Sequence, residues 1–438
     1  ISPEDEVYEI DEDFRQHMRK IVKKRNRLAP VRLELQGSRD DKAIEFLCKQ
    51  LSLSREQVFF SKAPLRMNYV FSLEGLLPPE SKTALCYPPY SPKAPGALRP
   101  EEKVLPQVLQ HDVLLFYPFQ SMDPFLHLVR EASSDPDVLS IKITIYRLAS
   151  KAKLAEYLCA AAENGKEVTV LMELRARFDE QNNIQWAERM EEAGCTILYG
   201  VEEIKVHSKI CLITRRERGK IQYITQVGTG NYNEKTAKQY TDLCLMTAWH
   251  ELGEDAAAFF RNMATANLEG EYHHLLVSPY QLRDRCIEGI DREIAKGNQG
   301  YIFLKLNSIT DRKLIDKLAE ASQAGVEIVM NVRGICCLLP GIPGLTDRIT
   351  VFSIVGRYLE HTRIYRFGRG EDAELYISSA DFMTRNTERR VEVACPVRAP
   401  EIRRKIFHII DVLTSDNVKA RQLGPDGQWH SRKVGHTP

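Results

Sequence analysis

The stretch LSIKITIYRLASKAKLAEYLCAAAENGKEVTVL, residues 139–171, aligns without gaps on QGYIFLKLNSITDRKLIDKLAEASQAGVEIVMN, residues 299–331. In each copy an apolar run of strand composition is followed by a helical segment and then by a second apolar run. Gly165 and the equivalent Gly325 follow the helical segment, where glycine tolerates the left-handed conformation that ends a helix. This βαβ pattern, present twice, predicts a duplicated α/β fold.

The repeat extends past these segments, and the difference in residue number between aligned positions decreases along the chain. This decrease indicates shorter loops in the second copy. Three further pairs align: VHSKICLI (206–213) on EHTRIYRF (360–367), GTGNYN (228–233) on SSADFM (378–383), and TDLCLM (241–246) on VEVACP (391–396). A polar, helical segment around 250–298 joins the copies. We therefore expect two duplicated domains, residues 106–274 and 275–438. Residues 1–105, which include a proline-rich stretch, are expected to be the end of a helical head domain and a linker.

Composition narrows the class of protein. The 438 residues contain 61 lysines and arginines against 60 acids, so net charge favours neither a nucleic-acid partner nor an anionic membrane. No apolar run of about 18 residues occurs, and the first residues lack the pattern of a signal peptide. We expect a cytoplasmic protein without a nucleic-acid partner, in which any anion site is a local cluster of basic residues.

Two His-x-basic pairs lie at equivalent points of the repeat, His207 with Lys209 and His361 with Arg363. Both pairs lie in apolar runs that read as strands, where positions i and i+2 share one face. A histidine nitrogen that attacks phosphorus needs a cation beside it to hold the phosphoryl oxygens. The duplication predicts that the two pairs face each other across a pseudo-twofold cleft.

Each copy also supplies a turn of small residues and then an acid. The turns end at Asn231 and Asp381, and the acids, Asp242 and Glu392, each follow eleven residues later. Such an acid can accept the proton of the ring nitrogen that is not used for attack, which fixes the tautomer of the histidine. We therefore count both acids as candidate catalytic residues.

Duplicated His-x-Lys segments followed by such a turn and an acid resemble the phospholipase D superfamily, which implies two phospholipase D-like α/β domains. That superfamily places an aspartate five residues after the lysine, whereas this chain has Thr214 and Gly368 there. The polyphosphate kinase family shares the fold without that aspartate, and the chain resembles it over nearly its whole length. The stretches that carry the resemblance are DVLLFYPFQS (112–121), IKITIYRLAS (141–150), ELRARFDE (173–180), KVHSKICLI (205–213), GTGNYNEKTAKQYTDL (228–243), VRGICCL (332–338), VGRYLEHTRIYRFG (355–368) and ISSADFMTRN (377–386).

The resemblance implies a role for individual residues. His207 would carry the phosphoryl group, and His361 would be a second active-site histidine near the nucleotide phosphates. Tyr240 would stack on adenine and Arg333 would clamp phosphate, with Asn231 in the same nucleotide site. The family also associates two further arginines with Mg²⁺. Because a guanidinium has no lone pair to offer a metal, we expect these two to hold phosphate oxygens that the metal also touches: Arg147 and Arg177.

The implied reaction is the reversible transfer of the terminal phosphate of ATP to inorganic polyphosphate through a phosphohistidine, with ADP as product and Mg²⁺ required. The resemblance also implies an N-terminal domain upstream of residue 1, a homo-oligomer and peripheral association with a membrane. Two alternatives stay open. One is a phospholipase D-type phosphodiesterase or nuclease, which the missing aspartates disfavour, and the other is a non-catalytic module that binds polyanions.

Overall fold

The computed structural model describes residues 14–25, 28–37, 40–176, 179–201 and 204–432. The chain divides into two compact units, residues 1–91 and residues 92–438. The first unit contains two parallel strands connected through α2, so the helical head expected from the sequence also holds a small sheet. Its elements are α1 (Phe14–Arg25), β1 (Leu33–Gln36), α2 (Asp41–Leu51), η1 (Arg55–Gln57), β2 (Val58–Ser61), α3 (Val70–Leu76) and α4 (Pro79–Leu85).

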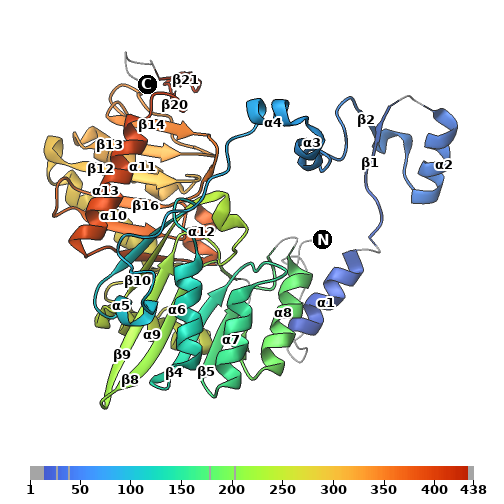
Figure 1. The fold of residues 1–438 in the computed structure, drawn as a ribbon. Coiled ribbons are helices and arrows are strands. Elements are labelled where there is room, and N and C mark those ends of the chain that lie inside the picture. The colour runs from blue at the N-terminus through green and yellow to red at the C-terminus, as the bar shows by residue number, and fades with distance from the viewer. Residues whose placement is uncertain (1–13, 26–27, 38–39, 177–178, 202–203, 433–438) are drawn as a thin grey trace. The chain divides into compact units, whose positions relative to one another are not determined.

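The second unit contains two mixed sheets, one from each copy of the repeat (Figure 1). The first sheet runs β3-β10-β9-β8-β4-β5-β6 and is covered by helices from the same copy. Its strands are β3 (Val113–Tyr117), β4 (Val138–Ile145), β5 (Glu167–Met172), β6 (Thr196–Leu198), β8 (Ile210–Glu217), β9 (Lys220–Gly228) and β10 (Tyr240–Thr247). The helical segments are α5 (Val104–Val108), α6 (Asp123–Ser134), α7 (Lys153–Glu163), α8 (Glu180–Glu192) and η2 (Thr236–Lys238).

The second sheet repeats this order as β11-β19-β17-β16-β12-β13-β14 and continues into β20 and β21. Its strands are β11 (Leu276–Val277), β12 (Tyr301–Leu306), β13 (Glu327–Val332), β14 (Ile349–Ile354), β16 (Ile364–Phe367), β17 (Glu374–Ser378), β19 (Val393–Pro396), β20 (Ala420–Leu423) and β21 (Trp429–Ser431). Helix α9 (His250–Ala264) packs against β8 and β9 of the first sheet. The helical segments that follow it are α10 (Gln281–Ile294), η3 (Gly297–Gln299), α11 (Arg312–Gln323), α12 (Thr384–Glu388) and α13 (Pro400–Ser415). The matching strand orders confirm the duplicated α/β fold.

The two quoted stretches form the parallel centre of each sheet. In the first, β4 and β5 pair in parallel through the crossover helix α7, and Gly165 follows that helix with a φ of +81°. In the second, β12, α11 and β13 repeat the unit, and Gly325 has a φ of +98°. Parallel strands need such a crossover, and burial on both faces explains their continuous apolar runs.

A shared core joins the sheets. Buried side chains of both sheets pack with those of α9 and α13, including Leu212, Phe259, Phe303 and Ile406. Helices α6, α7 and α8 lie side by side over the outer face of the first sheet, and α10 and α11 cover the outer face of the second (Figure 1). The second unit is therefore a layered α/β structure in which the two copies bury their inner faces together.

Two short strand pairs cross between the copies. Strand β7 (Lys205–Val206) pairs in parallel with β18 (Arg390–Val391), and β15 (Leu359–Glu360) pairs in parallel with the start of β10. The first sheet thus includes a strand of the second copy. The domain boundaries predicted at 105/106 and 274/275 stay predictions. Among the described helices, none combines the length and apolar composition needed to cross a bilayer.

The segment that joins the copies is anchored by one buried carboxylate. Asp255 on α9 accepts hydrogen bonds from the backbone N–H groups of His273, His274 and Leu275, at 3.1, 2.6 and 2.9 Å. We predict that Asp255→Ala lowers the stability of the folded chain by about 3 kcal/mol, because three backbone donors, of which that of Leu275 is buried, lose their acceptor. The midpoint of urea unfolding measures this loss. The exposed Asp291→Ala, which removes a surface ion pair to Lys317, is the matched control and should cost less than about 1 kcal/mol; equal losses would contradict the prediction.

Candidate active site

The crossing strand pairs bring each histidine beside an acid of the other copy. In the β7–β18 register Val206 faces Val391, so the next residues, His207 and Glu392, come side by side. In the β10–β15 register Thr241 faces Glu360, and the next residues are Asp242 and His361. Since paired residues of parallel strands point to the same face, the strand register alone builds two His–acid pairs.

The hydrogen bonds follow this register. Nδ1 of His207 lies 2.9 Å from both carboxylate oxygens of Glu392, and Nδ1 of His361 lies 2.9 Å from both oxygens of Asp242. A carboxylate only accepts, so Nδ1 carries the proton in each neutral ring and Nε2 keeps its lone pair. Each acid predicted from the sequence therefore contacts the histidine of the other copy, and its catalytic role stays a prediction.

A repeated hydroxyl orients each acid. Thr229 Oγ1 donates to Asp242 at 2.6 Å, and the equivalent Ser379 Oγ donates to Glu392 at 2.6 Å. Each hydroxyl also accepts the backbone N–H that follows the acid, from Leu243 or Val393. Next to Thr229, a Cβ on Gly230 would clash with Asp242 Oδ2. The glycine of the first turn thus lets Asp242 approach closely, whereas the equivalent residue of the second turn, Ala380, has a Cβ.

The predicted strand conformation of the His-x-basic segments is wrong. Residues 207–209 lie between β7 and β8, and residues 361–363 lie between β15 and β16, without ladder pairing of their own. The cause is the crossing pairs, because the chain must leave one sheet to reach the other before β8 or β16 begins. Between β7 and β8, the backbone N–H groups of His207 and Ser208 both donate to Val391 O at 2.9 Å.

Basic side chains surround both histidines. Lys209 is 1% exposed and donates to His207 O, and Arg363 is 4% exposed and forms an ion pair with Asp381 at 3.0 Å. Arg333 is half-buried and donates to Glu360 O at 2.6 Å, directly before His361. The Tyr240 ring lies 5.2 Å from the His361 ring. The structure therefore gathers the residues predicted for the nucleotide and the phosphates around the two histidines.

Burial sets the protonation state of the site. It lowers the pKa of His207 well below 6.5, and Lys209, Arg390 and Arg363 lower it further by repulsion. Burial also lowers the pKa of His361, although Asp242 opposes the shift. Burial raises the pKa of Glu392 in spite of the nearby cations. Both rings are therefore neutral near pH 7, and each holds a lone pair on Nε2.

Arg147, predicted to hold phosphate oxygens, has other surroundings. It is ion-paired to Asp179 at 2.9 Å, and its guanidinium lies 5.5 Å from the ring centre of Tyr146. Arg177 lies outside the described residues. Asn231 is the last residue of the turn, and its Oδ1 is buried without a hydrogen-bond partner in the described part of the chain.

Sequence reasoning missed three residues of the site. Tyr146 packs edge-to-face on His207 with ring centres 4.8 Å apart. Arg390 approaches Glu392 to 3.9 Å, and Asn307 donates its backbone N–H to Asp381 at 2.6 Å. Tyr146 directly precedes Arg147, and Arg390 lies two residues before Glu392. Their closeness in sequence to predicted site residues was the signal that could have identified them.

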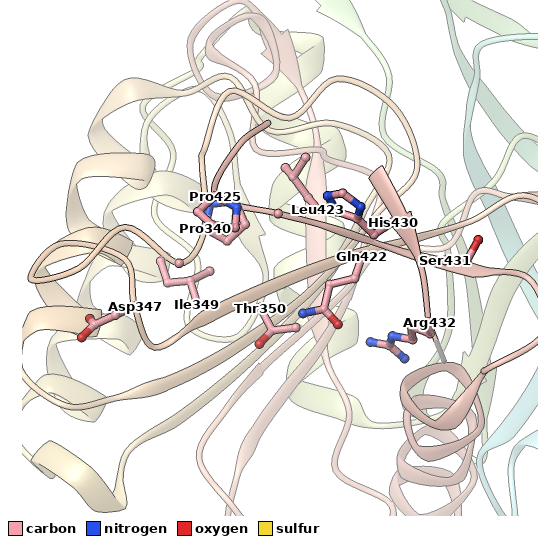
Figure 2. A pocket seen from close by; sticks show the side chains of 12 residues that line it. Pro340, Asp347, Ile349, Thr350, Gln422, Leu423, Pro425, His430, Ser431 and Arg432 are labelled. Carbon is pink, nitrogen blue, oxygen red and sulfur yellow. The ribbon is translucent and has the colours of Figure 1, made fainter. Parts of the chain in front are cut away.

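A pocket lies away from this site. It has a volume of about 430 Å³ and is formed at the outer end of the second sheet by residues of β14, β20 and β21 and the loops beside them, with Gln422, His430 and Arg432 among its lining (Figure 2). None of the predicted site residues lines it.

Comparison with known proteins places the chain among relatives with the same architecture. Three family profiles match in order: "Polyphosphate kinase middle domain" at residues 4–73, "C-terminal domain 1" at residues 103–269 and "C-terminal domain 2" at residues 275–437. The chain belongs to the polyphosphate kinase family. The polyphosphate kinase of Bacillus cereus is 44% identical over 422 residues, which cover 95% of this chain and 60% of that protein.

Two other relatives agree. The polyphosphate kinase of Pseudomonas aeruginosa is 42% identical, over 91% of this chain and 58% of that protein. The crystal structure of polyphosphate kinase from Porphyromonas gingivalis superposes with a TM-score of 0.82 at 34% identity, covering 94% of this chain and 63% of that one. The chain thus spans about 60% of the length of the polyphosphate kinases that it matches.

The lowered pKa of His207 predicts an unusual titration. An exposed histidine takes up its proton near pH 6.5, whereas the His207 ring should stay neutral through that range and protonate only at clearly lower pH. Nitrogen-detected NMR of ¹⁵N-histidine-labelled chain, with the signal assigned by its loss in His207→Gln, measures both the titration and the Nδ1–H tautomer. A titration midpoint at or above pH 6.5 would contradict the prediction.

Proposed function

We propose that this chain carries the phosphoryl-transfer site of a polyphosphate kinase, in which His207 takes the terminal phosphate of ATP and passes it to polyphosphate. The observation that carries the proposal is the buried contact of His207 Nδ1 with Glu392 at 2.9 Å, beside the side chain of Lys209. This arrangement presents a neutral nitrogen nucleophile next to a buried lysine. Burial lowers the pKa of Lys209 well below its usual value, although Glu392 opposes the shift, and bound phosphoryl oxygens would favour its charged form. Membership of the polyphosphate kinase family and the names of the relatives support the same substrate pair.

The first step follows from the positions of the side chains. The lone pair of His207 Nε2 forms a bond to the γ-phosphorus of ATP, and the bond from that phosphorus to the β–γ bridging oxygen breaks, so ADP leaves with its electrons. The Nδ1 proton moves toward Glu392 as positive charge develops on the ring. Lys209 in its charged form would balance the charge on the phosphoryl oxygens, while Arg363 lies beside His361 and is paired with Asp381.

The second step reverses the first with another partner. A terminal phosphate oxygen of polyphosphate attacks the phosphorus of the phosphohistidine, the N–P bond breaks, and Nε2 recovers its lone pair. His361, held by Asp242, is positioned to contact the oxygens of the attacking or leaving group. Tyr240 offers a stacking face for adenine and Arg333 a cation for the nucleotide phosphates, while Arg147 is assigned to phosphate oxygens rather than to a metal.

Magnesium enters this scheme only with the substrate. Within the described ranges, no group of three His, Cys, Asp or Glu side chains could hold a metal ion, and an arginine has no lone pair to donate. These residues do not fit a magnesium ion held by protein ligands alone. Mg²⁺ commonly binds through substrate phosphates and water, so we assign it to the nucleotide. Self-association, peripheral membrane contact and a cytoplasmic location stay predictions.

The nucleophile can be tested by labelling. With γ-labelled ATP we predict acid-labile, alkali-stable phosphorylation that maps to the peptide containing His207 and is lost in His207→Ala, since that substitution removes the nitrogen that forms the bond. His361→Ala should keep slow single-turnover labelling while polymer synthesis by the complete protein falls by about 100-fold or more. Normal labelling of His207→Ala, or diester cleavage without any label, would refute the proposed function.

The crossing of the His–acid pairs predicts which acid serves the nucleophile. Glu392→Gln should slow labelling of His207 by about 100-fold, because an amide keeps the shape but does not stabilise a positively charged ring. Asp242→Asn, the same change in the other half-site, should leave single-turnover labelling within about threefold of normal and act on polymer synthesis instead. Rapid-quench measurement of labelling compares them. A larger loss of labelling in Asp242→Asn would mean that each acid serves its own copy.

A further inference from the structure

The two half-sites occupy equivalent positions, and two of the differences between them concern the basic residue and its environment. Lys209 of the first copy corresponds to Arg363 of the second, and Asn231 corresponds to Asp381. The flanking acid and hydroxyl are retained, as Glu392 with Ser379 and Asp242 with Thr229. The half-sites therefore differ at the basic residue, Lys209 or Arg363. They also differ at the residue that pairs with Arg363 in the second copy, Asp381, whose counterpart in the first copy is Asn231.

In the second half-site the basic residue is neutralised and its donors are used. Arg363 Nε and Nη2 donate to the two oxygens of Asp381 at 3.3 and 3.0 Å, and Nη1 donates to Thr229 O at 3.1 Å and to His361 O at 2.9 Å. Asp381 is in turn held by the N–H of Asn307. The carboxylate of Asp381 offsets the positive charge of Arg363, and each guanidinium nitrogen has a hydrogen-bond acceptor.

The guanidinium of Arg363 also lies against the histidine ring. Its Nη1 is 3.2 Å from Nε2 and 3.4 Å from Nδ1 of His361, so one side of that ring is filled. For His207, the described part of the chain provides no hydrogen-bond partner to Nε2, and the ring contacts are with Tyr146 at its edge and Glu392 at Nδ1. The nitrogen available for attack is thus less encumbered in the first half-site.

In the first half-site polar atoms are left without partners. The ammonium of Lys209 donates to His207 O and lies 5.5 Å from the ring centre of Tyr146. Asn231 Oδ1 and Ser208 Oγ are both buried without a hydrogen bond to any described residue. The counterpart of Ser208, Thr362, is satisfied by Thr241 at 3.2 Å. Buried polar atoms without partners are rare in folded proteins. The Ser208 hydroxyl could donate to a phosphoryl oxygen, whereas Asn231 Oδ1 only accepts and would need a donor.

We propose that Asn231 and Asp381 decide which histidine accepts the phosphoryl group. A neutral amide at 231 leaves the charge of Lys209 for the phosphoryl oxygens at His207, whereas the carboxylate at 381 consumes the charge of Arg363 beside His361. The inference rests on the proposed function and names the residues that select its nucleophile. The selected step forms the His207 Nε2–P bond and breaks the bond from phosphorus to the leaving oxygen of ADP.

The first test adds the missing carboxylate. In Asn231→Asp the new charge should pair with Lys209, and single-turnover labelling of the His207 peptide by γ-labelled ATP should fall by about 100-fold or more. The matched control is Asn233→Asp, the same substitution in the same loop. Asn233 Oδ1 accepts from Lys235 N at 3.0 Å and Thr236 N at 3.2 Å, and a carboxylate keeps both bonds. Labelling of the control should stay within about twofold, and unchanged thermal midpoints establish that both variants are folded.

The second test copies the first half-site onto the second. His207→Ala alone should give no label, and adding Arg363→Lys with Asp381→Asn should produce label on the peptide containing His361. The double change avoids leaving a buried arginine without its carboxylate, which would destabilise the fold. Peptide mapping identifies the labelled histidine, a readout that a purely structural role of these residues would not move.

The outcomes distinguish a failure of this inference from a failure of the proposed function. Labelling of the unchanged chain at His207 with full labelling of Asn231→Asp would overturn the inference and leave the proposed function intact. Equal losses in Asn231→Asp and Asn233→Asp would also overturn it, because added charge rather than position would be responsible. Absence of label on His361 in the triple variant would remove the selecting role of Asp381. No label on the unchanged chain would refute the proposed function and the inference with it.

Discussion

The parallel pairing of β7 with β18 and of β15 with β10 is the constraint on which the site depends. Each pair is only two residues long, yet it crosses from one copy of the repeat to the other and places a histidine and an acid in the next register position. Slippage by one residue would turn the histidine to the opposite face from its acid. The shared core of α9 and α13 between the sheets prevents this by fixing the relative position of the copies.

Charge concentrates where these strands meet. His207, Lys209, Asp242, Arg363, Asp381 and Glu392 are all nearly inaccessible to water, and isolated burial of any one of them would cost several kcal/mol. Mutual pairing offsets most of this cost, but it does so unevenly, since Arg363 is matched by Asp381 while Asn231, the counterpart of Asp381, carries no charge. Burial lowers the pKa of Lys209 as well as that of His207, and the neutral His207 ring keeps the lone pair of Nε2 near pH 7.

Much of this arrangement was predictable because the chain contains two copies of one unit, which can be aligned with each other. His207 and His361, with Asp242 and Glu392, stand out only when the two copies are aligned, since a single His-x-Lys has no specificity. Local composition also predicted β4, α7 and β5 and their counterparts, because continuous apolar runs ending in Gly165 and Gly325 leave few alternatives. The strand expected through residues 207–209 failed for a reason outside local sequence, namely a partner strand 185 residues away from His207 in the chain.

The sequence by itself determined the duplicated α/β fold, the two histidines with their basic neighbours and the two acids, because these follow from periodicity and from residue types at repeated spacings. Only the tertiary structure decided that Glu392 contacts His207 and Asp242 contacts His361, and that Tyr146 and Arg390 lie beside these pairs. It also decided that Asp381 pairs with Arg363, while Asn231 Oδ1 has no hydrogen-bond partner among the described residues. The reason is physical: hydrogen bonds act over about 3 Å, and which groups come that close depends on strands that exchange between copies far apart in the chain.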